Sequence, residues 1–462
     1  MIWSHVFFRY ELCFIALIVF IFSLWLTLYL RFIQIRYFSH AWSLLNSKIK
    51  KSFDLGEISQ AQALTLGLSG TIGIANIAVV SACIVIAGPG SIFWLIVSAI
   101  VGMTIKFCEA TLGQKFRIEK NNHIFIGGPM VTLDRSLDEG QFKNPFISKK
   151  IKKVGLDIIS IAYTLSLLII ILIFGNLFQM NQLGDIFKDE YTLSLIQINH
   201  LPYMVIFLIM TLVWNGKFNR LAYFVARVIP VAISIYIIFC LSIILVNLDR
   251  FLDLIVVIFK DAFTIRANGY DNLFVFVIGI LLGMVSHESG LGISSIAHAS
   301  ARVRYPVHQG FIAMLEPFID TILICFCTAF VLLLAMDQGF QPTGFSSLNV
   351  KLAFEFFIPW FGLPFNLIMT LLTLSCLVSS YFYVGKLIQY LLSINLSLYT
   401  LLIYSVLIYV GAFVQIIDLI PIILYVLPFV ILPNLACIAI NIKDLRKDII
   451  VYLTNLDDSF VD

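Results

Sequence analysis

Long apolar segments alternate with short polar ones along almost the whole chain. Each apolar segment has roughly 17–25 residues, the length that an α-helix needs to cross the hydrocarbon core of a bilayer. The pattern predicts eleven such helices, at residues 13–33, 62–87, 91–114, 155–180, 200–216, 222–247, 273–299, 310–336, 363–385, 396–416 and 419–441. We therefore expect an all-α polytopic membrane protein with a single transmembrane domain over residues 1–462.

The positions of the basic residues predict the direction of each helix. Loops on the cytoplasmic side of a membrane carry an excess of Lys and Arg. With the N-terminus outside, all but six of the 30 Lys and Arg residues fall on the cytoplasmic side, and the six are Arg9, Lys188, Arg250, Lys260, Arg266 and Lys351. This asymmetry predicts an external N-terminus and a cytoplasmic tail at 442–462.

Composition agrees with this class and argues against others. Charged residues make up 12% of the chain, about half of the roughly 25% found in soluble domains. The eight cysteines lie in apolar segments without metal-site spacing, which favours a packing role. Arg31 and Arg36 follow the first apolar segment, and no small-residue cleavage site does, so we expect a retained helix instead of a signal peptide.

Two of the predicted helices are interrupted near their middle. The segment LSGTIGIANIA (68–78) interrupts the second helix, and GMVSHESGLGISS (283–295) interrupts the seventh. Glycine allows the backbone to leave the helix, but lipid offers no partner for the N–H and C=O groups that are then freed. Close helix packing also uses glycine, yet two glycine stripes at the same depth, each with polar neighbours, favour a polar cavity.

The two interruptions are five helices apart, and this odd offset gives their helices opposite directions. Residues 62–247 and 273–441 can therefore form two inverted five-helix repeats, with 13–33 as an extra N-terminal helix. Paired interruptions at corresponding positions of two halves mark the binding site of many transporters. A half-helix N-terminus suits a carboxylate, and freed carbonyl groups suit a small cation.

The interrupted helices also carry the motifs of a known family. The chain resembles the alanine or glycine:cation symporter family, which comprises sodium-coupled amino-acid carriers of bacteria and archaea. The stretches that carry the likeness are SGTIGIANIA (69–78), AGPGSIFW (87–94), GMTIKFCEATLGQKFR (102–117), GGPM (127–130), FGNLFQMNQ (174–182), SHESGLGISSIAHA (286–299) and YPVHQGFIAMLEPFIDT (305–321). The resemblance implies a LeuT-like fold, in agreement with the inverted repeat, and location in the bacterial inner membrane.

Positions are carried over from the family pattern as expectations. The residues implied to bind substrate are Thr71, Gly73, Ile74, Ala75, Asn76, Gln179, Ser286, His287, Ser289 and Gly290. The residues implied to bind sodium are Ser69, Ile72, Ser375 and Cys376. The family usually has glycine at Ala75, asparagine at His287 and a hydroxyl at Cys376. The Ala75 methyl narrows the pocket, His287 introduces a titratable ring, and the Cys376 sulfur is a poor ligand for a hard cation.

Other ionisable residues lie inside the predicted helices, where they are functional candidates by default. We expect Lys106 and Glu109, one helical turn apart, to pair with each other. Glu288 is expected to accept N–H groups of the interrupted turn, and Glu316 and Asp320 to form a network at a helix kink or a proton path. Basic residues expected to face solvent at the cytoplasmic rim are His298, Arg302, Arg304 and His308.

The resemblance implies a secondary active symporter that imports a small neutral amino acid, alanine or glycine, with sodium as the coupling ion. No organic cofactor or nucleic-acid partner is expected, membrane lipid surrounds the chain, and the oligomeric state is expected to be monomeric or weakly oligomeric. Two alternatives keep the fold, namely a proton-coupled carrier that uses His287 and Glu288, and an inactive relative. The sequence has no HExxH or GxSxG motif of an intramembrane enzyme, and interrupted helices favour an occluding carrier over a channel.

Overall fold

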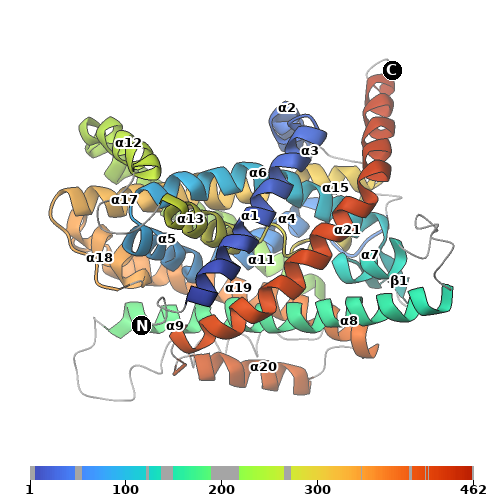
Figure 1. The fold of residues 1–462 in the computed structure, drawn as a ribbon. Coiled ribbons are helices and arrows are strands. Elements are labelled where there is room, and N and C mark those ends of the chain that lie inside the picture. Colours follow the sequence, from blue (N-terminus) through green and yellow to red (C-terminus); the bar gives the residue numbers. More distant parts are fainter. Residues whose placement is uncertain are drawn as a thin grey trace.

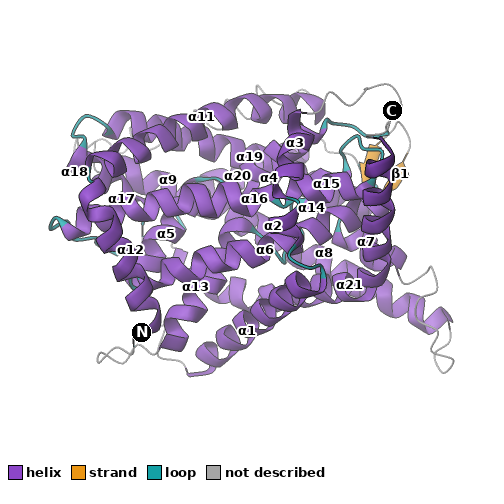
Figure 2. Cartoon of the chain, turned by 90° about the horizontal axis from the view of Figure 1, so that it is seen from above, coloured by secondary structure: helices purple, strands orange, loops and turns teal. Residues whose placement is uncertain are grey.

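The computed structural model describes residues 6–46, 55–120, 124–136, 149–188, 218–264, 272–344, 346–394, 398–411, 413–414 and 416–459. These residues are almost entirely helical (Figures 1 and 2). Up to residue 188 the elements are α1 (Val6–Tyr29), α2 (Ile33–Arg36), α3 (Phe38–Asn46), α4 (Gln60–Thr71), α5 (Ile74–Ala87), α6 (Gly90–Lys115), the antiparallel strands β1 (Ile118–Lys120) and β2 (Ile124–Ile126), α7 (Pro129–Ser136), α8 (Lys149–Leu172), a π-helical turn (Ile173–Leu177) and α9 (Phe178–Lys188).

The remaining elements are also helices. They are α11 (Phe218–Val246), α12 (Leu248–Phe263), α13 (Asn272–His287), α14 (Ser295–Ala299), α15 (Pro306–Ala313), α16 (Leu315–Pro317), a π-helical segment (Phe318–Cys325), α17 (Phe326–Asp337), α18 (Ser347–Phe357), α19 (Gly362–Leu392), α20 (Leu398–Gly411) and α21 (Ile416–Ser459). The long α21 ends in a segment that projects from the body of the protein (Figure 1).

Seven helices of the described residues are long and apolar enough to cross a membrane. They are Leu12–Tyr29, Gly90–Lys115, Ile158–Phe187, Tyr223–Val246, Pro306–Asp337, Gly362–Leu392 and Pro421–Asn455. The bent pair α4 and α5 can form an eighth crossing, while α13 and most of α20 are shorter apolar helices. The predicted helix 200–216 lies outside the described residues. The structure thus confirms an all-helical polytopic membrane protein.

The interruption predicted in the second helix is present. α4 ends at Thr71, α5 begins at Ile74, and the two axes differ by 48°. Gly73 lies between them with an extended backbone (φ −131°, ψ −179°), which ends the α-helical hydrogen-bond series. At its other end α4 begins with the capping box that Ser59 and Gln62 form, a signal that can be read from the sequence.

The interruption predicted in the seventh helix is also present, toward the end of the expected segment. α13 remains helical through Ser286 and His287, and residues 288–294 connect it to the short α14. Glu288, Gly290 and Gly292 all have left-handed φ values of 53°, 93° and 75°. Two of these three positions are glycines, which adopt this conformation without steric cost, so the sequence itself sets where the helix stops.

α6 is the buried element around which the other helices pack. It contacts α13, α14 and α15 along most of its length (Figure 2). Gly279 and Gly283 on α13 allow this contact, because a Cβ atom at either position would overlap Trp94 or Ser98 of α6. Small residues four apart are a common way for membrane helices to approach closely. The close contact holds the interrupted seventh helix against α6.

A fully buried ion pair joins α6 to the segment after α15. Lys106 Nζ lies 3.2 Å from Glu316 Oε2 and donates to Ser294 Oγ at 2.8 Å. On its other side Glu316 Oε1 lies 2.6 Å from His298 Nε2. α4 passes so close that a Cβ on Gly67 would overlap the Glu316 carboxylate. This network therefore fixes both interrupted helices relative to α6.

These contacts correct two sequence-based expectations. Lys106 pairs with Glu316 and not with Glu109, because the segment after α15 brings a carboxylate to Lys106 from the other side. Glu109 instead accepts a hydrogen bond from Gly290 N at 2.9 Å. His298 does not face solvent at a rim, since its side chain is fully buried against Glu316. Pairing was inferred from spacing on one helix, which carries no information about the neighbouring helix.

Substitution K106M tests the importance of the buried pair. It leaves the Glu316 carboxylate buried without its lysine, and the expected loss of unfolding free energy is about 3–5 kcal/mol. The double variant K106M/E316Q is expected to recover much of this loss, because it removes the uncompensated charge. The measurement is unfolding of the purified protein in detergent by denaturant titration. K447M, at an exposed pair with Asp444, is the control and is expected to cost less than about 1 kcal/mol; equal stability of K106M and K447M contradicts the prediction.

Candidate functional site

The N-terminus of α5 faces a side chain from α9. The first N–H groups of a helix have no partner within it, and one of them, Ala75 N, donates to Gln179 Oε1 at 3.2 Å. The Gln179 amide lies so close that a Cβ on Gly73 would overlap it. Ile74 and Ala75 are buried at the same turn. An amide oxygen therefore occupies the position at this helix end where a carboxylate oxygen is favoured.

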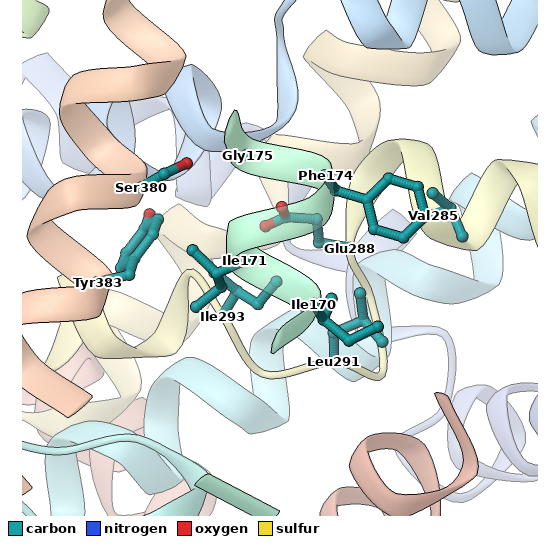
Figure 3. Close-up of a pocket in the computed structure, with 10 residues that line it drawn as sticks. All are labelled: Ile170, Ile171, Phe174, Gly175, Val285, Glu288, Leu291, Ile293, Ser380 and Tyr383. Atoms are coloured by element: carbon teal, nitrogen blue, oxygen red, sulfur yellow. The ribbon is translucent and has the colours of Figure 1, made fainter. Parts of the chain in front are cut away.

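A small cavity lies directly beside the interruption of the seventh helix (Figure 3). Its volume is about 10 Å³, room for about one water molecule. The lining residues are Ile170, Ile171, Phe174, Gly175, Val285, Glu288, Leu291, Ile293, Ser380 and Tyr383. The Glu288 carboxylate points toward the side of the cavity where Ser380 and Tyr383 of α19 lie. Its Oε2 atom is buried without a hydrogen-bond partner among the described residues.

A larger apolar cavity of about 160 Å³ lies next to the small one, between α1, α5, α13, α21 and the π-helical turn of the fourth predicted helix. Only apolar side chains line it, among them Leu12 of α1 and Leu427 of α21. Phe174 and Val285 line both cavities. These two side chains therefore stand between the apolar cavity and the Glu288 carboxylate.

Three polar side chains from separate elements meet beside the interruptions. Asn76 of α5 donates through Nδ2 to Asp320 Oδ1 at 2.5 Å and accepts a hydrogen bond from Ser286 Oγ of α13. Ser286 Oγ also lies 3.1 Å from Asp320 Oδ2, and Thr321 donates to the same oxygen at 2.9 Å. The Cys325 thiol lies 3.6 Å from Asn76 Oδ1. We call these five residues the Asp320 cluster.

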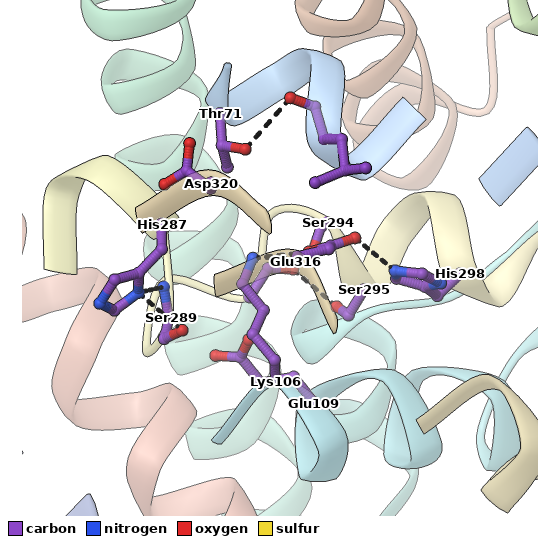
Figure 4. Close-up of polar contacts among 12 residues, drawn as sticks. Thr71, Lys106, Glu109, His287, Ser289, Ser294, Ser295, His298, Glu316 and Asp320 are labelled. Atoms are coloured by element: carbon purple, nitrogen blue, oxygen red, sulfur yellow. Dashed lines mark hydrogen bonds and ion pairs between the residues drawn. The ribbon is translucent and has the colours of Figure 1, made fainter. Parts of the chain in front are cut away.

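Asp320 is a site residue that sequence reasoning placed in a kink network or proton path. It belongs to a π-helical segment that follows Pro317, and such segments recur at functional sites. Its carboxylate is fully buried and, in the described part of the chain, lies within 4 Å of no lysine, arginine or histidine. Figure 4 shows Asp320 apart from the chain of contacts that links Lys106, Glu316 and His298. The signal available in the sequence was the aspartate within the motif EPFIDT.

His287 and Ser289, two of the residues predicted to bind substrate, lie on another side of the seventh helix. His287 Nε2 is 3.2 Å from Ser98 Oγ of α6, and its Nδ1 is 2.8 Å from Ser289 Oγ. Ser286 and His287 are successive residues of α13, so their side chains leave the helix about 100° apart. The structure therefore separates His287 from the Asp320 cluster and from the cavity at Glu288.

Gly290 is held through its backbone by two side chains that sequence reasoning did not assign to the site. Its N–H donates to Glu109, and its carbonyl accepts from Asn434 Nδ2 of α21 at 2.8 Å. Asn434 Nδ2 also lies 2.5 Å from Glu109 Oε1. Asn434, a side chain of α21, thus helps to hold the interruption of the seventh predicted helix. Local sequence patterns do not predict this contact.

The four residues predicted to bind sodium come from two helices: Ser69 and Ile72 lie in α4 and at its C-terminal end, and Ser375 and Cys376 lie in α19. Cys376 Sγ donates to Gly70 O at 3.3 Å, so it faces α4. Ser375 instead donates to Leu371 O of its own helix at 2.9 Å, and the hydroxyl that meets Ser69 is that of Ser379. Positions 375 and 376 precede 379 by four and three residues, so all three lie toward one face of α19. Ile72 is buried at the end of α4, where Thr71 Oγ1 donates to Leu68 O at 3.1 Å.

Sequence comparisons find relatives among amino-acid carriers. A sequence model of the sodium:alanine symporter family matches residues 3–459. A protein from Methanococcus maripaludis named sodium/alanine symporter AgcS is 30% identical over 375 residues, which are 80% of this chain and 79% of that protein. An uncharacterized transporter from Haemophilus influenzae is 32% identical over 320 residues, 68% of this chain and 65% of its own length. A Bacillus subtilis protein named probable sodium/glutamine symporter GlnT is 28% identical over 334 residues, 72% of this chain and 64% of its own length.

Among solved structures, a manganese transporter from Eremococcus coleocola aligns with a TM-score of 0.49 and 7% identity, over 82% of this chain and 74% of its own. The family match covers nearly all of the chain, including both interruptions and the Asp320 cluster. The chain belongs to the sodium:alanine symporter family.

Proposed function

We propose that the protein is a secondary active symporter that imports a small neutral amino acid, alanine or glycine, with sodium by alternating access. The observation that carries the proposal is the meeting of both interrupted helices at the Asp320 cluster, where Asn76, Ser286 and Asp320 place oxygen atoms around one point. Hard cations such as sodium prefer oxygen ligands. Relatives named for sodium with alanine or with glutamine support this class of substrate.

In this proposal the two charged ends of the amino acid are bound differently. Its carboxylate takes the place of the Gln179 amide at the N-terminus of α5, where the helix dipole favours negative charge. The coupling ion lies at the Asp320 cluster, because a cation stabilises a buried carboxylate that has no base within 4 Å. The predicted site at Ser69, Ile72, Ser375 and Cys376 is a weaker candidate, since the side chain there that faces the Gly70 carbonyl is the Cys376 thiol, and sulfur is a poor ligand for a hard cation.

The membrane arrangement is part of the same proposal. We infer a plasma-membrane carrier with the N-terminus outside, two inverted five-helix repeats over 62–247 and 273–441, and an extra N-terminal helix. The close pairing of α5 with α13 supports the repeat, since these are the halves of the two interrupted helices. In this orientation the apolar cavity of about 160 Å³ lies on the external side, and Phe174 and Val285 separate it from the site.

One sodium ion supplies enough driving force for uptake. A charge that crosses about 100 mV releases roughly 2.3 kcal/mol, and a tenfold concentration gradient adds about 1.4 kcal/mol. The sum supports accumulation of a neutral solute by roughly 500-fold.

Uptake of labelled alanine and glycine into proteoliposomes tests the function directly. We expect uptake that requires an inward sodium gradient and stops when choline replaces sodium. D320N keeps the side-chain shape but removes the charge, so it is expected to raise the sodium concentration for half-maximal uptake at least about 10-fold, or about 1.4 kcal/mol. D337N, at the exposed end of α17, is the control. Undiminished uptake in choline contradicts sodium coupling, and a normal sodium response of D320N contradicts the ion site.

Substitution Q179E tests the carboxylate site at α5. A second carboxylate at this position repels that of the substrate, and like charges placed together cost several kcal/mol. We expect the KM for alanine to rise about 30- to 100-fold, equivalent to about 2–3 kcal/mol. Q338E adds the same charge at an exposed position and is expected to transport like the unmodified protein. The assignment is wrong if Q179E and Q338E have the same KM.

Substitution H287N distinguishes sodium coupling from proton coupling through the histidine. His287 contacts Ser98 and Ser289 instead of the Asp320 cluster, so we expect sodium-driven uptake to continue with an unchanged profile between about pH 5 and pH 8. A proton-coupled carrier that relies on His287 is expected to lose its pH dependence in this variant. The measurement is the initial uptake rate at fixed sodium concentration across the pH range.

A further inference from the structure

Glu288 has a buried carboxylate oxygen that the proposed transport mechanism does not use. The residue follows directly after α13 with a left-handed backbone, φ 53°, and its side chain lines the small cavity of about 10 Å³ (Figure 3). No hydrogen bond reaches Oε2 from the described residues. A buried charge is normally paired or hydrogen-bonded, so this oxygen lacks a partner that the protein itself supplies.

Glu288 forms no direct ion pair with a base of the described residues. In the described residues no lysine, arginine or histidine lies within 4 Å of its carboxylate. The buried lysine of this region, Lys106, is bound to Glu316 at 3.2 Å and to Ser294 at 2.8 Å. Lys106 therefore acts on Glu288 only from beyond ion-pair distance, which leaves room for a cation bound directly to the carboxylate.

The end of α13 makes the same place more negative. The last four carbonyl groups of a helix have no partner within it, and the helix dipole places about half a negative charge there. Glu288 follows His287, the last residue of α13. Ser380 and Tyr383 of α19 add two hydroxyl groups to the cavity wall. The cavity thus combines a carboxylate, a helix C-terminus and hydroxyl oxygens, which are ligands for a cation.

The size of the cavity limits what can bind. A volume of about 10 Å³ accommodates one particle of the size of a water molecule. Sodium and hydronium are of this size, whereas an amino acid is much larger. The ammonium group of the substrate is therefore a poorer fit than a separate small ion.

We propose that Glu288, with Ser380 and Tyr383, binds a second monovalent cation that is carried together with the amino acid. The proposal rests on the proposed symport function and extends it, because the ion at Glu288 is additional to the one at the Asp320 cluster. Each transport cycle then moves two positive charges with one neutral substrate. Accumulation driven by the membrane potential consequently depends on Glu288.

The test measures the number of charges carried per amino acid. Full-length protein in proteoliposomes receives equal sodium and equal pH on both sides, and a potassium diffusion potential is varied up to about 100 mV. The logarithm of the alanine accumulation ratio against potential gives the charge number. E288Q keeps the shape of the side chain but removes its charge, so at about 100 mV we expect about 50-fold lower accumulation than in the unmodified protein, the effect of one lost charge.

Control variants separate the ion site from a general defect. E355Q, a glutamate substitution in α18 away from the cavity, is expected to keep the full charge number. S380A and Y383F keep the carboxylate and are expected to raise the cation concentration for half-maximal uptake several-fold, which tests the site even if E288Q fails to fold. An unchanged charge number in E288Q, or a rise in the KM for alanine alone, overturns the proposal; the latter result assigns Glu288 to the substrate ammonium group.

Two further measurements identify the ion at Glu288 and allow this site to be tested independently of the proposed transport function. Alanine accumulation is measured while the sodium concentration is varied at fixed pH, and then while the pH is varied at fixed sodium concentration. The variable that changes accumulation identifies the second ion as sodium or hydronium, and a response to neither overturns the site. If the unmodified protein accumulates no amino acid, the transport proposal fails. The stabilisation of the purified protein by sodium alone then still tests the site, since the rise in melting temperature is expected to be smaller in E288Q than in E355Q.

Discussion

The structure depends on the requirement that backbone N–H and C=O groups freed inside a membrane find partners within the protein. Lipid cannot hydrogen-bond them, and each unsatisfied group costs several kcal/mol. Both interruptions meet this requirement with side chains from other helices. Gln179 accepts from Ala75 N, and Glu109 and Asn434 hold the N–H and the carbonyl of Gly290. An interrupted helix is stable here because side chains of neighbouring helices form hydrogen bonds with its freed backbone groups.

This requirement explains why so many polar residues are buried in so apolar a chain. Lys106 and Glu316 form an ion pair at the centre of the packing, and the pair links α6 to both interrupted helices. Close approach at Gly279 and Gly283 brings α13 against α6. Because these polar groups are hydrogen-bonded to one another across helices, we expect a substitution at one of them to alter the geometry of the site. The same dense packing leaves only a water-sized cavity at Glu288.

In the proposed mechanism, carboxylates inside the membrane domain give the site its preference for cations. Glu316 has Lys106 as a direct partner, whereas Asp320 and Glu288 have no base within 4 Å among the described residues. Charge balance in a medium of low dielectric constant then favours bound cations at both places. A carrier built in this way uses the ion to complete its own structure. This gives the ion and the substrate a common reason to bind together, since both stabilise the ends of interrupted helices.

Sequence reasoning identified the local features of the site. Gly290 and Gly292 adopt left-handed backbone conformations, and Gly73 leaves room for the Gln179 amide, so glycine marks both interruptions in the sequence. Asn76 and Ser286 were expected at the site, and the structure brings them together. Predictions from residue spacing along one helix were wrong where the interaction partner lies on another helix. It paired Lys106 with Glu109, and it grouped His287 with Ser286 although the His287 side chain contacts Ser98 and Ser289.

The sequence by itself determined the class of the protein and the two places where helices stop, because hydropathy and glycine act locally along the chain. Of the predicted membrane helices, seven, or eight with the bent pair α4 and α5, are long and apolar enough to cross a membrane in the described residues. The tertiary structure alone decided which side chains satisfy the freed backbone, that Asp320 joins Asn76 and Ser286, and that Glu288 is left without a partner. Such contacts depend on the rotation and depth of each helix relative to its neighbours. Packing across the whole bundle sets these quantities, and no segment of the sequence contains them.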